Sequence, residues 1–413
     1  MKKLFYFTES YPYGLHESWK TDELRYLSKY FEEIFVIPNN YGNSKEFQGF
    51  ESENIFYFTP LFEELYCLSF RSKFISILCS KFIFLLLSEF LKEVRSFELS
   101  KFKELINSTY NILELSKNRK FLEIRKKITQ HDVSLFFWGR GTSEYIGFQK
   151  LNGKSVIRYH GFDLYDFRHF SKYIPYQKRQ IKNANLNLCI SRHGELYLKN
   201  KFPNLQERIK LNYLGSEDPN IYLNPKKHTH LIKQSFTIIS CSRLIPLKRM
   251  GLLMEALITI RSLKITWIHI GDGEERKMLE EKSRFLGGNI NFKITGWLRH
   301  EEIFDLYLTE SPQLFINLSE TEGLPVSIVE ACSCGIPIFA TDVGGNSEIV
   351  NNENGVLLDK EITPYELAKL IEAYSNKLKV EFALLSKNSY SIFKQNFEMS
   401  LCKSQLINFI NDL

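Results

Sequence analysis

Two glutamates eight positions apart, Glu322 and Glu330, bracket a segment in which a strand changes into a short helix. The apolar run 314–318 predicts a buried strand, Pro325 suits the start of a helix, and Gly335 indicates the helix end. A strand therefore leads through a loop into a helix. The first amides of that helix would attract an anion such as a diphosphate.

The two acids beside this predicted anion site indicate what the rest of the ligand contains. Carboxylates repel phosphates, but they accept hydrogen bonds from hydroxyl groups, so Glu322 and Glu330 fit a ribose and a sugar. A nucleotide sugar satisfies all of these requirements. The spacing alone is equally compatible with an ordinary surface loop and two solvated glutamates, so the decision depends on other motifs.

Two cations lie upstream, between the apolar strand 236–240 and a helical pattern that starts near Leu252. Arg243 can fork onto phosphate oxygens and Lys248 can act as a point charge. Together they could hold a diphosphate leaving group. The alternative is a pair of solvated basic residues.

Two further predicted strands, 265–270 and 290–295, end at Gly271 and Gly296. A glycine in this place allows the base or a phosphate of a ligand to approach the backbone closely. Gly271 opens a Gly-x-Gly sequence, which on its own is a weak signal. Trp297 follows the second glycine directly.

These motifs resemble, in their order, those of the family-four retaining glycosyltransferases, which have the GT-B fold of two facing Rossmann-like domains with a cleft between them. The resemblance covers nearly the whole chain. Its strongest parts are Glu-Gly-Leu-Pro at 322–325, Ser-Arg-Leu at 242–244, Gly-Asp-Gly at 271–273 and Thr-Asp-Val-Gly-Gly at 341–345.

The resemblance implies roles for the donor-side residues. Arg243 and Lys248 would bind the donor diphosphate, Glu322 would contact the donor sugar, and Glu330 would hold the ribose hydroxyls. Backbone near Gly296 and Trp297 would contact the base. The expected donor-binding residues are Gly271, Gly296, Trp297, Gly323, Leu324, Pro325, Val326 and Glu330.

The amino-terminal half contains the loop 158–165, which looks like the loop of this family that carries a histidine into the cleft beside the transferred sugar. That resemblance makes His160 a catalytic candidate together with Glu322, Arg243 and Lys248. A histidine after a strand is otherwise more often a packed or capping residue. Asp163 could simply cap the following turn.

The first strand-to-helix loop departs from the pattern of many relatives, which carry a Gly-Gly pair there. This chain has only Gly14, and in that it resembles a subset of the family that acts on surface polysaccharides and lipopolysaccharide-like acceptors. Gly14, Glu17 and Asp163 are the expected acceptor-side residues. Glu17 could equally be a first-turn helix residue favoured by the helix dipole.

The length of 413 residues predicts two domains, because single cores rarely grow to this size. Strands alternate with helices, which indicates an α/β class with parallel doubly wound sheets. We expect an acceptor-side domain at 1–215, joined by a returning helix at 390–413, and a nucleotide-sugar-binding domain at 216–389. The polar stretch 215–234 would link them, with two solvated histidines rather than metal ligands.

Composition excludes several classes of function. A net charge of +6 with dispersed basic residues does not favour nucleic acid as a partner. The 44% hydrophobic content is typical of soluble globular proteins, and the scattered cysteines predict reduced thiols. The opening residues run directly into the strand 4–7, so we expect no secretory leader and a cytoplasmic location. Because Asp-x-Asp is absent, we expect no metal cofactor.

A long helical insertion, 61–128, separates two strands of the first domain. Its segment 70–87 is very apolar but is interrupted by Lys81, so its apolar runs are too short to span a membrane. Arg71, Lys73 and Lys81 among aromatic residues fit a helix in the interface of an anionic membrane, which would place the enzyme peripherally on the cytoplasmic face. The alternative is a buried helix of the first domain.

The sequence therefore predicts a retaining glycosyltransferase that moves a sugar from a nucleoside diphosphate sugar to a glycan or lipid-linked acceptor in surface polysaccharide synthesis. A nucleotide-sugar epimerase of the same architecture is one alternative. A catalytically silent nucleotide-sugar-binding module is another. Turnover of a donor, with or without an acceptor, distinguishes the three.

Overall fold

The computed structural model describes residues 2–14, 17, 20–42, 44–63, 68–93, 98–219, 235–377 and 379–413. The chain divides into two compact units. Unit 1 comprises Met1–Asn212 with Gln405–Leu413, and unit 2 comprises Tyr213–Ser404. The return to unit 1 thus begins at Gln405, later in the chain than the position 390 expected from the sequence.

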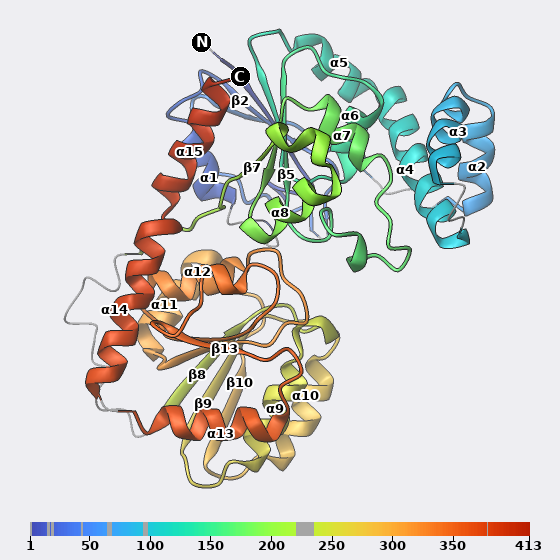
Figure 1. The fold of residues 1–413 in the computed structure, drawn as a ribbon. Coiled ribbons are helices and arrows are strands. Elements are labelled where there is room, and N and C mark those ends of the chain that lie inside the picture. The colour runs from blue at the N-terminus through green and yellow to red at the C-terminus, as the bar shows by residue number, and fades with distance from the viewer. Residues whose placement is uncertain are drawn as a thin grey trace. The chain divides into compact units, whose positions relative to one another are not determined.

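Unit 1 is built on a seven-stranded parallel sheet in the order β3-β2-β1-β4-β5-β6-β7 (Figure 1). Every residue of its interior strand β1 is buried, because helices cover both faces of a parallel sheet of this kind. The sequence did not reveal the short strands β3 and β7. The strands are β1 Leu4–Thr8, β2 Ile34–Pro38, β3 Ile55–Tyr57, β4 Val133–Phe136, β5 Lys154–Tyr159, β6 Leu186–Cys189 and β7 Ile209–Leu211.

The helices of unit 1 connect these strands, and a group of four of them occupies the long segment between β3 and β4. They are α1 Lys20–Leu27, α2 Phe70–Leu78, α3 Phe82–Glu93, α4 Leu99–Lys117, α5 Arg119–Lys127, α6 Glu144–Phe148, α7 Gln177–Asn183 and α8 Arg192–Lys201.

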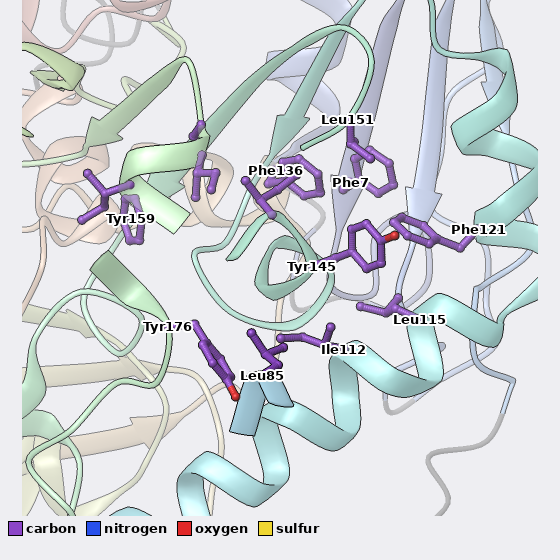
Figure 2. Packing of buried hydrophobic residues seen from close by; sticks show 14 of the residues in the cluster. Phe7, Leu85, Ile112, Leu115, Phe121, Phe136, Tyr145, Leu151, Tyr159 and Tyr176 are labelled. Atoms are coloured by element: carbon purple, nitrogen blue, oxygen red, sulfur yellow. The ribbon is translucent and has the colours of Figure 1, made fainter. Parts of the chain in front are cut away.

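The inserted helices α2 to α5 are neither wholly core nor wholly surface. Ile112 and Leu115 of α4 and Leu85 of α3 belong to the buried cluster that contains the sheet residues Phe7 and Phe136 (Figure 2). Helices α2 and α3 pack on α4, while α4 packs on α6. The insertion therefore extends the core of unit 1 with α4 and presents α2 and α3 on its outside.

The outer helices leave apolar side chains in solvent. Ile75 of α2 is 59% exposed and Phe84 of α3 is 73% exposed, whereas Ile77 and Leu86 in the same helices are buried. Within the described residues, no single helix has the length and apolar composition of a membrane span. The pair Phe70–Leu78 and Phe82–Lys92 meets that criterion only when taken together, and it bends by 109°.

Unit 2 contains a six-stranded parallel sheet in the order β10-β9-β8-β11-β12-β13 (Figure 1). Four strands agree with the sequence-based expectation to within one residue, but β12 and β13 were not predicted. The strands are β8 Phe236–Cys241, β9 Ile265–Ile270, β10 Ile290–Ile294, β11 Leu314–Asn317, β12 Ile338–Thr341 and β13 Gly355–Leu358.

The helices of unit 2 cover this sheet and enclose a second, separate core around the fully buried Trp267. The predicted linker 215–234 and its two histidines, His228 and His230, lie outside the described residues from position 220 onward. The helices are α9 Met250–Thr259, α10 Arg276–Lys282, α11 His300–Glu310, α12 Val326–Ser333, α13 Pro364–Ser375, α14 Lys379–Asn396 and α15 Met399–Asn411, the last of which ends in unit 1.

If α4 forms part of the core, Ile112→Ala should lower the free energy of unfolding by about 2–5 kcal/mol, because it leaves a cavity at a fully buried position. The matched control Ile75→Ala removes the same atoms from an exposed site on α2 and should change it by less than about 0.5 kcal/mol. Urea unfolding of the full chain measures both. Equal effects of the two substitutions would contradict the assignment of α4 to the core.

Candidate functional site

In unit 2 the strand order reverses between β8 and β11, which are hydrogen-bonded neighbours. Loops that follow two such strands turn to opposite faces of the sheet, and ligands of open α/β sheets bind at the strand ends in the crevice between these loops. The Ser-Arg-Leu motif follows β8 and the Glu-Gly-Leu-Pro motif follows β11. The topology therefore brings the two strongest sequence motifs to one edge of the sheet.

Lys248 and Glu322 link these two loops directly. The Lys248 Nζ donates to Glu322 Oε1 at 2.5 Å, and both side chains are largely buried. Ser319 Oγ donates to the same oxygen at 2.6 Å and Asn317 Nδ2 at 3.3 Å. Burial opposes ionisation of Glu322, but the charge of Lys248 and these hydrogen bonds outweigh it and lower the pKa of the carboxyl. Glu322 is therefore a carboxylate, with one oxygen fully engaged.

Arg249, the neighbour of Lys248, connects the loop after β8 to the loops after β11 and β13. Its Nε donates to the carbonyl of Leu318 at 2.7 Å, and its Nη1 donates to the carbonyl of Lys360 at 2.7 Å. The amide of Glu320 also donates to the carbonyl of Leu247 at 2.9 Å. Arg249 thus serves the structure of the loops, a role that the sequence did not distinguish from that of Lys248.

Helix α12 begins one residue later than expected, with Pro325 as its cap instead of its first residue. The amides of Val326 and Ser327 make no hydrogen bond to the described residues, as is usual in a first helical turn. Gly335, with a φ of +68°, ends the helix as predicted, because its amide bonds to Cys332 at 2.9 Å and the next amide to Ala331 at 3.0 Å. Unsatisfied amides therefore remain at the start of α12, directly after Glu322 and Gly323.

Glu330 lies in α12 and is 5% exposed. Its Oε1 accepts a hydrogen bond from His300 Nε2, at 2.8 Å, and His300 is the first residue of α11. The contact fixes Glu330 in one orientation. Nothing in the sequence pattern pointed to His300, because a histidine at a helix start is usually solvated.

The Thr-Asp-Val-Gly-Gly motif at 341–345 packs against the loop that carries Glu322. A Cβ on Gly344, whose φ is +54°, would lie 2.0 Å from the carbonyl oxygen of Glu322. The amide of Gly345 donates to the carbonyl of Gly323 at 2.9 Å, and Thr341 Oγ1 donates to that of Ser319 at 2.6 Å. The motif therefore shapes the loop backbone around Glu322.

Arg243 differs from Lys248 in its surroundings. Its side chain is exposed, and it forms no hydrogen bond or ion pair with any residue in the described parts of the chain. The same loop passes so close to Gly271 that a Cβ there would lie 2.0 Å from the carbonyl oxygen of Ser242. Gly271, predicted to let a ligand approach, thus already allows the close approach of the protein's own backbone.

A buried relay fixes Ser242. Trp267 Nε1 donates to Ser240 Oγ at 2.9 Å, and Ser240 Oγ lies 2.8 Å from Nδ1 of His269, a fully buried residue of β9. His269 Nε2 lies 3.1 Å from the carbonyl of Ser242, which can only accept, so this nitrogen carries the proton. Burial lowers the pKa of His269 to about 4. The relay is therefore neutral, and the sequence pattern had indicated only an apolar strand.

The remaining donor-side candidates follow β9 and β10. Gly271 and Gly296 form an isolated antiparallel bridge, in which the Gly271 amide donates to the Gly296 carbonyl at 3.0 Å. Gly296 has a φ of +77°, and Trp297 is 43% exposed. A partly exposed indole therefore adjoins the backbone of the loop after β10.

In unit 1, His160 directly follows β5 and is 7% exposed. Its ring lies 4.1 Å from that of Trp138 and 4.6 Å from that of Phe137, measured between centroids. Neither ring nitrogen has a hydrogen-bond partner among the described residues. Burial lowers the pKa of His160, and the facing carboxylate of Asp163 opposes that effect only in part. A neutral imidazole, whose Nδ1 lies 3.6 Å from Asp163 Oδ2, is thus fixed by aromatic packing.

Asp163 is more than a cap for the next turn. One oxygen accepts from the amides of His160 at 2.8 Å and Gly161 at 3.1 Å, and the other accepts from the amide of Gly139 at 2.7 Å. Burial opposes ionisation of Asp163, but His160 and these bonds outweigh it and lower its pKa. Asp163 joins the loop after β4 to the loop after β5 and so holds His160 in place.

Glu17 precedes α1 and is not one of its first-turn residues. Its carboxylate accepts from the amides of Ser10 at 2.9 Å and Tyr11 at 2.8 Å, from Trp138 Nε1 at 2.9 Å, and from the fully buried Lys20. Although burial opposes its ionisation, the charge of Lys20 and these bonds lower the pKa of Glu17. Glu17 therefore organises the loop after β1.

Gly14, the other acceptor-side candidate, has a φ of +69° and donates its amide to the carbonyl of Glu46 at 3.0 Å. It allows the loop after β1 to turn. Across the described residues, no group of three or more His, Cys, Asp or Glu side chains is arranged to hold a metal ion.

Residues 224–381 match the family described as Glycosyl transferases group 1. The chain contains a glycosyl transferases group 1 domain. This domain falls in unit 2 and includes Arg243, Lys248, Glu322 and Glu330.

Individual proteins that resemble this chain are also named as glycosyltransferases. The chain is 23% identical, over 256 residues, to a UDP-N-acetylglucosamine–peptide N-acetylglucosaminyltransferase GtfA subunit of Streptococcus parasanguinis, over 59% of this chain and 48% of the relative. It is 26% identical, over 54% of its length and 55% of the relative, to a putative teichuronic acid biosynthesis glycosyltransferase, TuaC, of Bacillus subtilis. The chain thus spans about half the length of these relatives.

Solved structures show the fold of the chain that carries the group 1 domain. HepE of Anabaena in complex with UDP aligns over 100% of both chains with a TM-score of 0.65 and 19% identity. Sucrose-phosphate synthase of Thermosynechococcus elongatus aligns with a TM-score of 0.69 and 14% identity over 100% of this chain and 99% of the other. The expected GT-B fold, with two Rossmann-like parallel-sheet units, is therefore confirmed.

The neutral state of His269 predicts a pH dependence of stability. Below its ordinary pKa of 6.5 the unfolded chain binds a proton that the folded chain refuses down to about pH 4, so the free energy of unfolding should fall over this range. His269→Gln lacks this component. Between pH 7 and pH 4, the free energy of unfolding of wild type should therefore fall by about 3 kcal/mol relative to that of the variant.

Urea unfolding at several pH values measures this difference. His131→Gln is the control, because it makes the same replacement at an exposed position. A constant gap between wild type and His269→Gln would show that the buried imidazole is not held neutral.

Proposed function

We propose that the protein is a retaining glycosyltransferase which transfers a sugar from a nucleoside diphosphate sugar to a glycan or lipid-linked acceptor in surface polysaccharide synthesis. The observation that carries the proposal is the edge of the unit 2 sheet at β8 and β11. There, free helix amides, one exposed arginine and a lysine–glutamate pair follow the same two strands.

The donor diphosphate fits the cations and amides of this edge. Arg243 is exposed and can fork onto phosphate oxygens, and the first amides of α12 carry the positive end of the helix dipole. Lys248 can add its charge while it remains bonded to Glu322. As the bond to the sugar breaks, these groups stabilise the negative charge that develops on the leaving diphosphate.

The hydroxyl groups of the donor fit the two glutamates. Glu322 Oε2 takes part in none of the hydrogen bonds that Lys248, Ser319 and Asn317 make to Oε1, and it is the acceptor we assign to a sugar hydroxyl. Glu330 keeps one oxygen on His300 and offers the other to the ribose. HepE of Anabaena has been solved with UDP and with UDP-glucose, which supports a sugar nucleotide as the ligand class.

The acceptor is assigned to unit 1, where His160 is the catalytic candidate. Its neutral imidazole has no hydrogen-bond partner at Nε2 among the described residues, and this nitrogen can exchange a hydrogen bond with a sugar hydroxyl. Glu17 and Asp163 position the loops around it. In retention, the acceptor hydroxyl attacks the face from which the diphosphate leaves, so the departing phosphate oxygen is the base nearest to the attacking proton.

Donor binding predicts distinct outcomes for the two cations. Arg243→Ala should weaken binding of a nucleoside diphosphate by about 1.5–3 kcal/mol, the usual contribution of a hydrogen bond to a charged group, without loss of stability. Lys248→Ala should weaken binding similarly and should also destabilise the fold, since it leaves the buried Glu322 unpaired. Isothermal titration calorimetry with UDP, GDP and ADP measures the affinities.

Arg261→Ala serves as a control, because Arg261 is an exposed arginine of unit 2 outside the loops after β8 and β11. Unchanged diphosphate affinity in both Arg243→Ala and Lys248→Ala would remove the proposed site. Formation of an epimerised sugar nucleotide in the absence of acceptor would instead identify an epimerase. Binding without any turnover would identify a silent binding module.

Metal independence is a separate prediction. Because cations and helix amides of the chain are proposed to neutralise the diphosphate, sugar transfer should persist at full rate in excess EDTA. The assay follows release of the nucleoside diphosphate in the presence of acceptor. Loss of activity with EDTA and its recovery with magnesium or manganese would overturn this account of the leaving group.

A further inference from the structure

Unit 1 contains a cavity of about 790 Å³ that its acceptor-side candidates do not line. It is formed where α3 and the start of α4 meet α6, α7 and the segment 166–174. Neither His160 nor Glu17 nor Asp163 lines it. Its size falls within the range of about 300–1,000 Å³ that is usual for small-ligand sites.

The lining is strongly basic. Seven cationic side chains and only two carboxylates face the cavity. Both carboxylates are already neutralised within unit 1: Glu89 accepts from Arg179 at 3.0 Å and from Lys92 at 2.8 Å, and Asp166 pairs with Lys201 at 2.5 Å. The cavity therefore has an excess of positive charge that these contacts do not offset.

Three lysines carry this excess. Lys172, Lys178 and Lys182 line the cavity and are exposed, and their side chains form no hydrogen bond or ion pair with residues in the described part of unit 1. Lys178 and Lys182 are four positions apart in α7, so they share a face of the helix and repel each other. An anion bound between the two ammonium groups would offset this repulsion.

Strongly exposed apolar side chains flank the lining lysines in the sequence. Such a combination of cations and exposed apolar groups is typical of surfaces that contact the interface of an anionic membrane. The pairs are Leu91 (71% exposed) beside Lys92, Leu99 (62%) near Lys101, and Phe170 (98%) near Lys172.

We propose that this cavity binds the phosphate group of a membrane-borne amphiphile, with the three lysines around the phosphate and the apolar side chains in the lipid interface. A phosphate-linked lipid is one of the acceptor classes of the proposed transferase, and its delivery to unit 1 is the part of the inference that rests on the proposed function. The affinity of the cavity for lipid phosphate does not depend on catalysis.

The test is co-sedimentation of the full chain with vesicles of phosphatidylcholine, with and without phosphatidylglycerol. The cavity variant is Lys172→Gln/Lys178→Gln/Lys182→Gln. The matched control is Lys29→Gln/Lys126→Gln/Lys127→Gln, which removes the same charge from exposed positions of unit 1 outside the cavity. Wild type and control should bind the anionic vesicles in a salt-sensitive manner, and the cavity variant should bind them roughly a hundredfold more weakly. Equal binding by the two triple variants would overturn the proposal.

Two further measurements identify the source of the phosphate. Leu91→Ser/Phe170→Ser should weaken vesicle binding but leave binding of soluble glycerol 3-phosphate unchanged. If glycerol 3-phosphate binds the wild type as tightly as the vesicles do, and this double variant keeps its vesicle affinity, the cavity serves a free phosphate and the membrane source is wrong.

Titration with nucleoside diphosphate separates this proposal from the proposed function. The cavity variant should keep the wild-type affinity for the diphosphate, because the three lysines lie in unit 1 and the donor is assigned to unit 2. Loss of that affinity in the cavity variant would overturn the inference. A wild type that binds anionic vesicles but no nucleoside diphosphate would sink the proposed function and leave the lipid phosphate site standing.

Discussion

The reversal of strand order between β8 and β11 is the constraint on which the candidate donor site depends. Loops after these strands leave on opposite faces of the sheet, so nothing in the sheet itself holds their ends together. The chain supplies that connection through the Lys248–Glu322 pair and through Arg249, which donates to the carbonyl of Leu318. A buried ion pair seldom adds much net stability, because desolvation offsets the attraction. Its value here is that it sets the distance between two loops that the fold leaves independent.

In unit 1, too, buried charged side chains connect loops that follow different strands, and more of them take part. Arg158 is fully buried and donates through Nη1 to both oxygens of Glu23 at 2.9 Å, and Lys20 lies 3.8 Å from the centroid of the Phe137 ring. The Glu17–Lys20 pair continues this group of charges to Trp138 and hence to His160. Each acid has at least one cation as its partner, which is the condition for ionised groups to persist away from water. The loops after β1, β4 and β5 are consequently tied to one another by polar contacts in addition to the aromatic packing of His160 on Phe137 and Trp138.

Local patterns in the sequence predicted what depends on near neighbours in the chain. The central strands, the Gly335 helix end, the loop positions of Arg243, Lys248 and Glu322 and the helical position of Glu330 follow from hydrophobic runs and from glycine and proline placement. The strands β12 and β13 were missed, although β4, β6 and β11, which were predicted, are equally short. Contacts between residues distant in the sequence could not be predicted either. His300 and Glu330 are 30 positions apart, and no motif near His300 indicates their contact. The glycines at 271 and 344 were visible, but that each faces a carbonyl of the protein itself became evident only from the packing.

The hydrogen bonds through His269 fix the loop after β8 without adding a charge to it. An imidazole that stays neutral fixes the carbonyl of Ser242 without adding a positive centre beside the place assigned to the diphosphate. In the proposed site, the attraction for that anion would come from Arg243, Lys248 and the helix amides. In a transferase the spent nucleoside diphosphate carries more negative charge than the donor it came from, so every additional cation would hold the product more tightly than the substrate. A neutral scaffold with few cations therefore favours product release, and repeated turnover, over retention of the leaving group.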